Sequence, residues 1–133
     1  TREHAATLDR LAVDYLGERS ELETITRAGL AQRLRHDPRP LVLDVRPAAE
    51  FLAGHVPGAV SVPPDELAAR VRRIPTADDV VAYCRGSYCI YADDAVRALR
   101  RRGVRAARLE DGFPEWRRAG LPVAVGDERA APR

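Results

Sequence analysis

The sequence predicts an α/β domain with a mainly parallel sheet and helices on both faces. Short apolar stretches alternate with helix-like stretches from residue 25 to residue 125, and this alternation is typical of a parallel sheet. The strand-like stretches are almost continuously apolar, as in residues 41–45 and 80–83, which is the pattern of strands buried on both faces. The chain has 133 residues, the size of one ordinary domain.

The first expected element is an amphipathic helix over residues 7–16. Its apolar residues recur at helical spacing, at positions 8, 11, 12, 15 and 16. Gly17 ends it, and polar residues 20–23 form a linker. We therefore divide the chain into an N-terminal helix with its linker (1–20), a compact domain (21–126) and a flexible tail (127–133). One apolar stripe leaves open whether the helix folds back on the domain or pairs with something outside it.

The compact domain begins at Ile25, and its elements are separated by Gly and Pro. Thr26 is the expected N-cap of the first helix, and Gly103 follows the longest helix as its C-terminal cap. The expected strands are residues 41–45, 59–62, 80–83 and 104–109. The expected helices are residues 27–35, 47–51, 63–74, 93–102 and 112–119, the last with Trp116 in the core.

Composition limits the classes of function. The net charge of +2 is a small difference between 22 basic and 20 acidic residues, so nucleic-acid binding by this chain alone is not expected. The arginine run 100–102 ends a helix, where cations complement the helix dipole, and we assign it to the surface. No apolar run is long enough to span a bilayer and no signal segment is present, so a cytoplasmic protein without a membrane partner is expected.

The stretch around Cys84 is the strongest candidate for a functional site. Cys84 lies at the carboxyl end of an expected strand, just before a helix, where α/β sheets bind ligands and backbone N–H groups favour anions. The positive end of the helix and Arg85 should both lower the pKa of the thiol. Cys84 could instead be a small buried hydrophobe, but the polar residues 85–88 argue against it. Cys89 is either a second thiol facing this loop or a packing residue.

Three other polar residues have both functional and structural explanations. Asp44 and Arg46 end a strand on the side of the candidate site, and could support it. A carboxylate that caps loop N–H groups, with Arg46 paired to Glu50, explains them equally well. His55 could titrate near neutral pH, but in a turn a structural hydrogen bond is the favoured role.

Two separated stretches resemble the rhodanese, or sulfurtransferase, family. The first contains Leu-Asp-Val-Arg at 43–46, Glu-Phe at 50–51 and Gly-His-Val-Pro-Gly-Ala at 54–59. The second contains Asp-Gly-Phe-Pro-Glu-Trp at 111–116 and Gly-Leu-Pro-Val at 120–123. The resemblance covers most of residues 24–125 and implies the rhodanese-like fold, a mainly parallel five-stranded sheet with helices on both faces.

Within that family the chain is similar to the rhodanese half of regulators that carry an N-terminal ArsR-type winged helix. The shared patterns are Tyr-Cys-Arg-Gly-x-Tyr-Cys at 83–89 and Leu-Glu-Asp-Gly-Phe-Pro-Glu-Trp at 109–116. On this resemblance residues 8–17 correspond to the last helix of the winged domain. It implies a homodimer through this helix, and DNA contact only through a domain that is not in this chain.

The resemblance also implies a reaction. Cys84 would accept a sulfane sulfur from a small donor and pass it to a thiol or to cyanide, with no metal or other cofactor. The persulfide would be held by backbone N–H groups of the loop, namely those of Arg85, Gly86, Ser87, Tyr88 and Cys89. Thiosulfate-using members often have a basic residue where this chain has Cys89, which favours a persulfide donor. The alternative function is a persulfide- or redox-sensing module of a transcription regulator that uses both Cys84 and Cys89.

Overall fold

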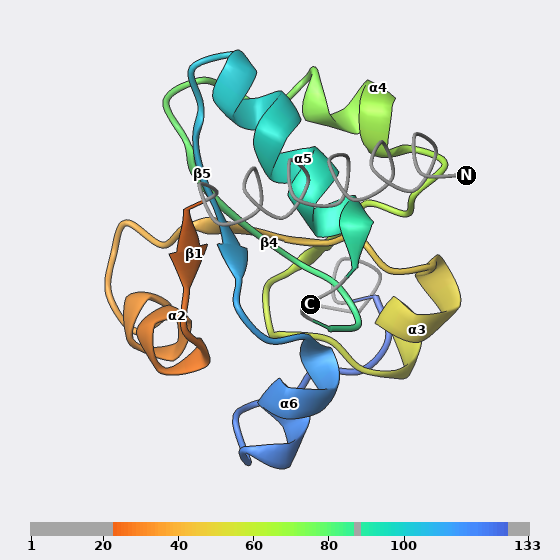
Figure 1. Ribbon diagram of the computed structural model, residues 1–133. Coiled ribbons are helices and arrows are strands. Elements are labelled where there is room, and N and C mark those ends of the chain that lie inside the picture. Colours follow the sequence, from red (N-terminus) through yellow and green to blue (C-terminus); the bar gives the residue numbers. More distant parts are fainter. Residues whose placement is uncertain (1–22, 87–88, 128–133) are drawn as a thin grey trace, which may run out of the picture.

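The computed structural model describes residues 23–86 and 89–127 and contains one five-stranded sheet (Figure 1). The strand order is β1-β5-β4-β2-β3, and all four pairings are parallel. The strands are β1 (Thr24–Ile25), β2 (Leu41–Asp44), β3 (Val60–Ser61), β4 (Asp79–Tyr83) and β5 (Arg105–Leu109). The predicted fold class is therefore confirmed.

Helices cover both faces of this sheet. They are α2 (Arg27–Arg33), α3 (Ala48–Ala53), α4 (Leu67–Val71), α5 (Ile90–Arg101) and α6 (Phe113–Arg118). The core on one face joins the sheet to α4 and α5, and the core on the other face joins it to α2, α3 and α6. Trp116 of α6 lies in the second core and is 1% exposed, as expected.

The central strand β4 ends where two chain connections diverge. After β2 the chain passes through α3 to β3, toward one edge of the sheet. After β4 it passes through α5 to β5, toward the other edge. The two connections diverge, so the carboxyl ends of β2 and β4 flank a topological switch point, which is where open α/β sheets bind ligands. Cys84 directly follows β4, and Val45 and Arg46 follow β2.

Several element boundaries differ from the sequence-based expectations. The longest helix begins at Ile90 rather than residue 93, and Cys89 is its N-cap residue. The N-cap position holds a cysteine and not the Ser, Thr, Asp or Asn that would signal that start. The edge strand β1 was not predicted, because two residues carry no periodicity. Thr26 does cap α2, since its Oγ1 accepts a hydrogen bond of 3.0 Å from the amide of Gly29.

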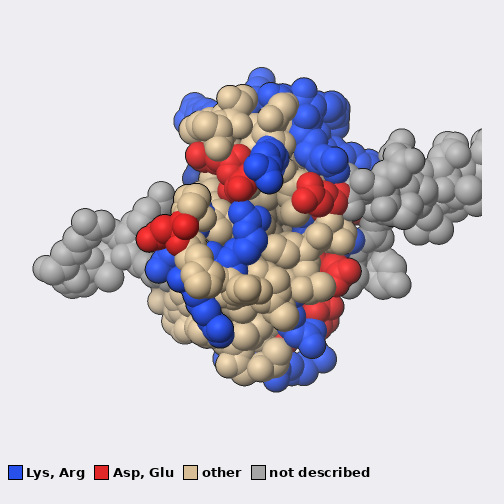
Figure 2. Space-filling view, turned by 90° about the vertical axis from the view of Figure 1, so that its left-hand side faces the viewer, with Lys and Arg blue, Asp and Glu red and all other residues tan. Residues whose placement is uncertain are grey.

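The face of the molecule in Figure 2 carries side chains of both signs of charge. In the arginine run, Arg100 and Arg101 are exposed, as expected. Arg102 instead donates hydrogen bonds to the carbonyls of Val71 and Ile74, at the end of α4.

In the described part of the chain, no helix is both long enough and apolar enough to cross a membrane. The predicted helix 7–16 and most of the predicted tail lie outside the described residues.

Candidate active site

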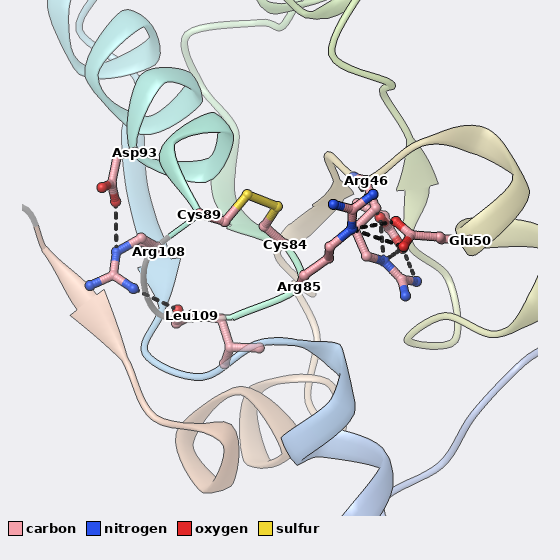
Figure 3. The surroundings of a disulfide bond; sticks show 9 residues. Arg46, Glu50, Cys84, Arg85, Cys89, Asp93, Arg108 and Leu109 are labelled. Atoms are coloured by element: carbon pink, nitrogen blue, oxygen red, sulfur yellow. Dashed lines mark hydrogen bonds and ion pairs between the residues drawn. A yellow bond between two sulfur atoms is a disulfide. The ribbon is translucent and has the colours of Figure 1, made fainter.

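Cys84, at the end of β4, is bonded to Cys89, at the start of α5. The two residues form a disulfide with their Cα atoms 6.0 Å apart (Figure 3). Cys84 is 3% exposed and packs in the core on the α5 face of the sheet, while Cys89 is partly buried against the same core. Both alternatives considered for Cys89 are thus partly realised, because it packs and it also reaches the first thiol. In this state Cys84 has no free thiol.

The loop between the two cysteines is anchored by the start of α6. The amide of Phe113 donates a 3.0 Å hydrogen bond to the carbonyl of Cys84, and the amide of Cys89 donates one of 3.2 Å to the carbonyl of Gly86. Gly112 lies directly against the loop. A Cβ atom there would be 2.2 Å from the carbonyl carbon and oxygen of Arg85. The φ of −101° at Gly112 is open to any residue, so the backbone conformation does not require glycine here. The close approach does.

Arg85 points away from the disulfide. Its Nε donates hydrogen bonds of 2.8 and 2.9 Å to the two carboxylate oxygens of Glu50 in α3, on the far side of the loop from Cys89 (Figure 3). The Arg85 side chain is 63% exposed, so this ion pair contributes little stability. The expected ion pair of Arg46 with Glu50 was wrong. Glu50 accepts hydrogen bonds from Arg85, and Arg46 forms its ion pair with a nearer carboxylate. A role for Arg85 in lowering the thiol pKa stays a prediction.

That nearer carboxylate is Asp44, which is fully buried at the end of β2. It accepts hydrogen bonds from the amide, Nε and Nη2 of Arg46, the shortest being 2.6 Å. It also accepts one of 2.6 Å from the hydroxyl of Tyr83, the residue before Cys84. The Tyr83 oxygen in turn accepts from the amide of Val56. The expected capping role of Asp44 is therefore present, and it is extended to the end of β4.

Two groups in this network have shifted pKa values. Burial and then the charge and hydrogen bond of Asp44 raise the pKa of Tyr83 well above its ordinary value of 10.0. Burial lowers the pKa of Arg46, but the hydrogen bond and charge of Asp44 outweigh this, so the net shift is upward. Both side chains therefore keep their protons at physiological pH. Arg46 also lies over the ring of Phe113, with its Cζ 4.3 Å from the centroid.

His55 has a structural role, as favoured from the sequence. It is fully buried, its Nδ1 lies 2.8 Å from the carbonyl oxygen of Phe51, and its ring stacks on the Phe51 ring at 3.8 Å. Its backbone forms a bridge with Ala124. Ser87 and Tyr88 lie outside the described residues, so their place in the site stays a prediction.

A second buried ion pair beside the disulfide was missed by the sequence analysis. Asp93, in the first turn of α5, lies 2.8 Å from the Nε of Arg108 in β5, and their side chains are 1% and 11% exposed. The sequence contained a signal for both residues. Asp93 falls on the apolar side of the helix, and Arg108 lies in a strand expected to be buried. Opposite charges at two expected core positions could have been paired.

The fold and this site define a class of α/β domain in which a cysteine at a strand end faces a helix N-terminus. The sequence profile of the rhodanese-like domain matches residues 26–119, so the chain belongs to the rhodanese-like family. It is 48% identical over 124 residues to the HTH-type transcriptional regulator Rv0324 of Mycobacterium tuberculosis. That match covers 93% of this chain and 54% of the regulator, so the chain spans about half of that relative.

Other relatives share the family. A protein named sulfurtransferase from Allochromatium vinosum is 35% identical over 102 residues, which are 76% of this chain and 94% of that protein. Among solved structures, the rhodanese-like domain of the Alr3790 protein from Anabaena superposes with a TM-score of 0.68 at 26% identity. It covers 83% of this chain and 84% of the Anabaena chain. The rhodanese resemblance drawn from the sequence is therefore confirmed.

Gly112→Ala should displace the loop after Cys84, because the new Cβ would lie 2.2 Å from the Arg85 carbonyl. We expect the free energy of unfolding to fall by about 1–3 kcal/mol. Alkylation of Cys84 in the reduced protein should change in rate. Arg118→Ala, at an exposed position in the same helix, is the control and should change neither quantity. A Gly112→Ala protein with wild-type stability and reactivity would contradict the close approach.

Tyr83→Phe should reduce stability at neutral pH by about 1–3 kcal/mol, because Asp44 loses a donor and Val56 an acceptor. The pKa of Tyr83 is raised on folding, so the unfolded chain releases this proton first, above about pH 10. The wild-type protein should therefore lose stability more steeply above pH 10 than the variant. Denaturant titrations from pH 7 to 11.5 measure this. Tyr91→Phe, which removes an exposed hydroxyl, is the control; equal slopes in all three proteins would refute the assignment.

Proposed function

We propose that this chain is a sulfurtransferase domain that carries a sulfane sulfur on Cys84. The observation that supports it is the place of Cys84, at the end of the central strand, at the topological switch point and just before the N-terminus of a 12-residue helix. Helix N-termini present unpaired N–H groups and favour a thiolate or a persulfide anion. Membership of the rhodanese-like family and the sulfurtransferase relative support the same activity.

The reaction has two steps and starts from the reduced protein. The Cys84 thiolate attacks the outer sulfur of the donor, and the donor leaves with the electron pair of its sulfur–sulfur bond, as a thiolate or as sulfite. An acceptor thiolate or cyanide then attacks the outer sulfur of the Cys84 persulfide, and Cys84 leaves as a thiolate. No net oxidation occurs, so no further cofactor is required. The loop N–H groups of residues 85–89 hold the persulfide between the two steps.

A small persulfide is the donor that this site favours. The side chain at position 89 is a thiol and not a cation, and the guanidinium of Arg85 is turned to Glu50. Neither group is then placed to hold the two charges of thiosulfate. A persulfide carries one charge at most, which the loop N–H groups and the helix N-terminus can satisfy.

Cys84→Ser should abolish sulfur loading, because a hydroxyl is not ionised at neutral pH while its neighbours are unchanged. Intact-mass measurement of the reduced protein after exposure to glutathione persulfide should find a one-sulfur adduct on the wild type. It should find none on Cys84→Ser. An adduct that persists on the variant would transfer the chemistry to Cys89.

A second candidate function is a sensor of persulfide or redox state, and the Cys84–Cys89 disulfide specifically favours it. The Cys89 thiolate can attack the inner sulfur of the Cys84 persulfide and expel hydrosulfide, which leaves the observed disulfide. The Cα separation of 6.0 Å is within the usual range for such a bond. The regulator relative supports this candidate. DNA contact and dimerisation would then come from an upstream winged-helix domain and from residues 8–17.

Cys89→Ala separates the two candidates. The variant should load sulfur on Cys84 as the wild type does, and its persulfide should persist longer because the attacking thiol is gone. The wild-type protein should proceed to a species two hydrogens lighter than the reduced chain, with a Cys84–Cys89 link in the peptide map. Equal persulfide lifetimes and no such link would leave Cys89 as a packing residue and would remove the sensing candidate.

A further inference from the structure

The buried ion pair of Asp93 and Arg108 has no part in the reaction described above, yet it lies near the Cys84–Cys89 disulfide. In Figure 3 it is on the Cys89 side of the disulfide, opposite the side to which Arg85 turns. Burying two charges costs several kcal/mol per ion, and even a well-formed buried pair often adds no net stability. Stability alone is therefore a weak explanation for this pair.

Sheet register places Arg108 on the same face as Cys84. The Cα partner of Arg108 across the β4–β5 pairing is Ala82, two residues before Cys84. Side chains alternate along a strand, so Ala82, Cys84 and Arg108 point to one face. Ala82 and Cys84 indeed share the core beneath α5 with Ala106, two residues before Arg108. In regular sheet geometry the Cα atoms of Cys84 and Arg108 are about 8 Å apart.

The other charged groups around the loop are turned away or already satisfied. Arg85 pairs with Glu50 and is exposed. Asp44 and Arg46 pair with each other, and register places Asp44 opposite Tyr83, on the other face of the sheet. At the start of α6, Asp111 pairs with Arg27 of α2. Among the described residues, Asp93 and Arg108 are thus the buried charges on the face of Cys84, and Arg97, one turn after Asp93 in α5, is partly buried with a buried Nη2.

We propose that Arg108, oriented by Asp93, is the positioning residue whose buried charge stabilises the Cys84 thiolate and its persulfide anion. A cation near a thiol favours ionisation, and burial strengthens the effect because little water screens it. Asp93 opposes it, since a nearby anion disfavours a second anion. It also holds the guanidinium in place, together with the carbonyl of Leu109, to which Arg108 Nη1 donates at 3.2 Å. This inference gives Arg108 the role that the sequence assigned to Arg85.

The two halves of the pair therefore have opposite effects on Cys84, whereas a purely structural pair would not. Removing either partner of a structural pair loosens the start of α5 and disturbs the site in the same direction. On our proposal, Arg108→Gln removes the favourable charge and keeps the charge of Asp93, so the pKa of Cys84 rises. Asp93→Asn removes the unfavourable charge and leaves Arg108 unopposed, so this pKa falls. The sign of the shift is the discriminating observation.

The experiment is the pH dependence of iodoacetamide alkylation, measured on the reduced full chain in a Cys89→Ala background so that only Cys84 reacts. Arg108→Gln should raise the alkylation midpoint by about one pH unit, which is about a tenfold loss of rate below the midpoint. Asp93→Asn should lower the midpoint. The double variant should lie between the two, and Arg108→Lys should stay closer to the parent than Arg108→Gln. Arg85→Ala should move the midpoint less than Arg108→Gln.

Several results would overturn the proposal. They are shifts of the same sign in the two single variants, no shift in either while both remain folded, or a larger shift in Arg85→Ala. If Arg108→Gln does not fold, the double variant and Asp93→Asn decide, and an unchanged or raised midpoint in Asp93→Asn refutes the proposal. The inference rests on the proposed sulfur chemistry only for the function that a stabilised Cys84 thiolate would serve. Alkylation needs no sulfur donor, so a failure to load sulfur would leave this measurement valid.

Discussion

The site depends on one buried carboxylate, that of Asp44, which ties together the ends of β2 and β4. An unpaired carboxylate in this position would cost several kcal/mol, and here Arg46 and the hydroxyl of Tyr83 satisfy it. Arg46 also donates to the carbonyl of Gly54, so the turn before β3 is fixed by the same network. Because Tyr83 is the residue before Cys84, this network fixes where the central strand ends and where the loop begins.

From that fixed point the loop is held by elements on both faces of the sheet. Phe113 and Gly112 hold its first residues from the α6 side, through a hydrogen bond to Cys84 and a contact that only glycine allows. On the α5 side, Asp93 and Arg108 join the first turn of the helix to β5. Elements on both faces of the sheet thus fix the position of Cys84. On the proposed function, opening the Cys84–Cys89 disulfide would rearrange the loop between the two cysteines.

The fold could be predicted from the sequence because the patterns that specify its elements lie within short stretches of the chain. Apolar runs, caps and turn residues gave strands β2, β3, β4 and β5 and all five described helices, with boundaries a few residues away. The edge strand β1 exists only through its pairing with β5, which no local pattern encodes. At the site, Cys84 and the capping by Asp44 followed from position along the chain. The partners of Arg46, Arg85 and Asp93 did not, because each depends on which strands and helices become neighbours in space.

A paired arginine suits a cysteine that changes charge. Cys84 is neutral in the disulfide and negative as a thiolate or a persulfide. A lone buried arginine would be satisfied only in the anionic states and would be an uncompensated buried charge in the disulfide. Asp93 compensates the charge of Arg108 while Cys84 is oxidised. When the disulfide opens, the field of Arg108 still favours ionisation of the Cys84 thiol. The pair thereby keeps the oxidised and reduced states of the loop closer in free energy than a single charge could. Similar free energies in two states are what a redox signal requires.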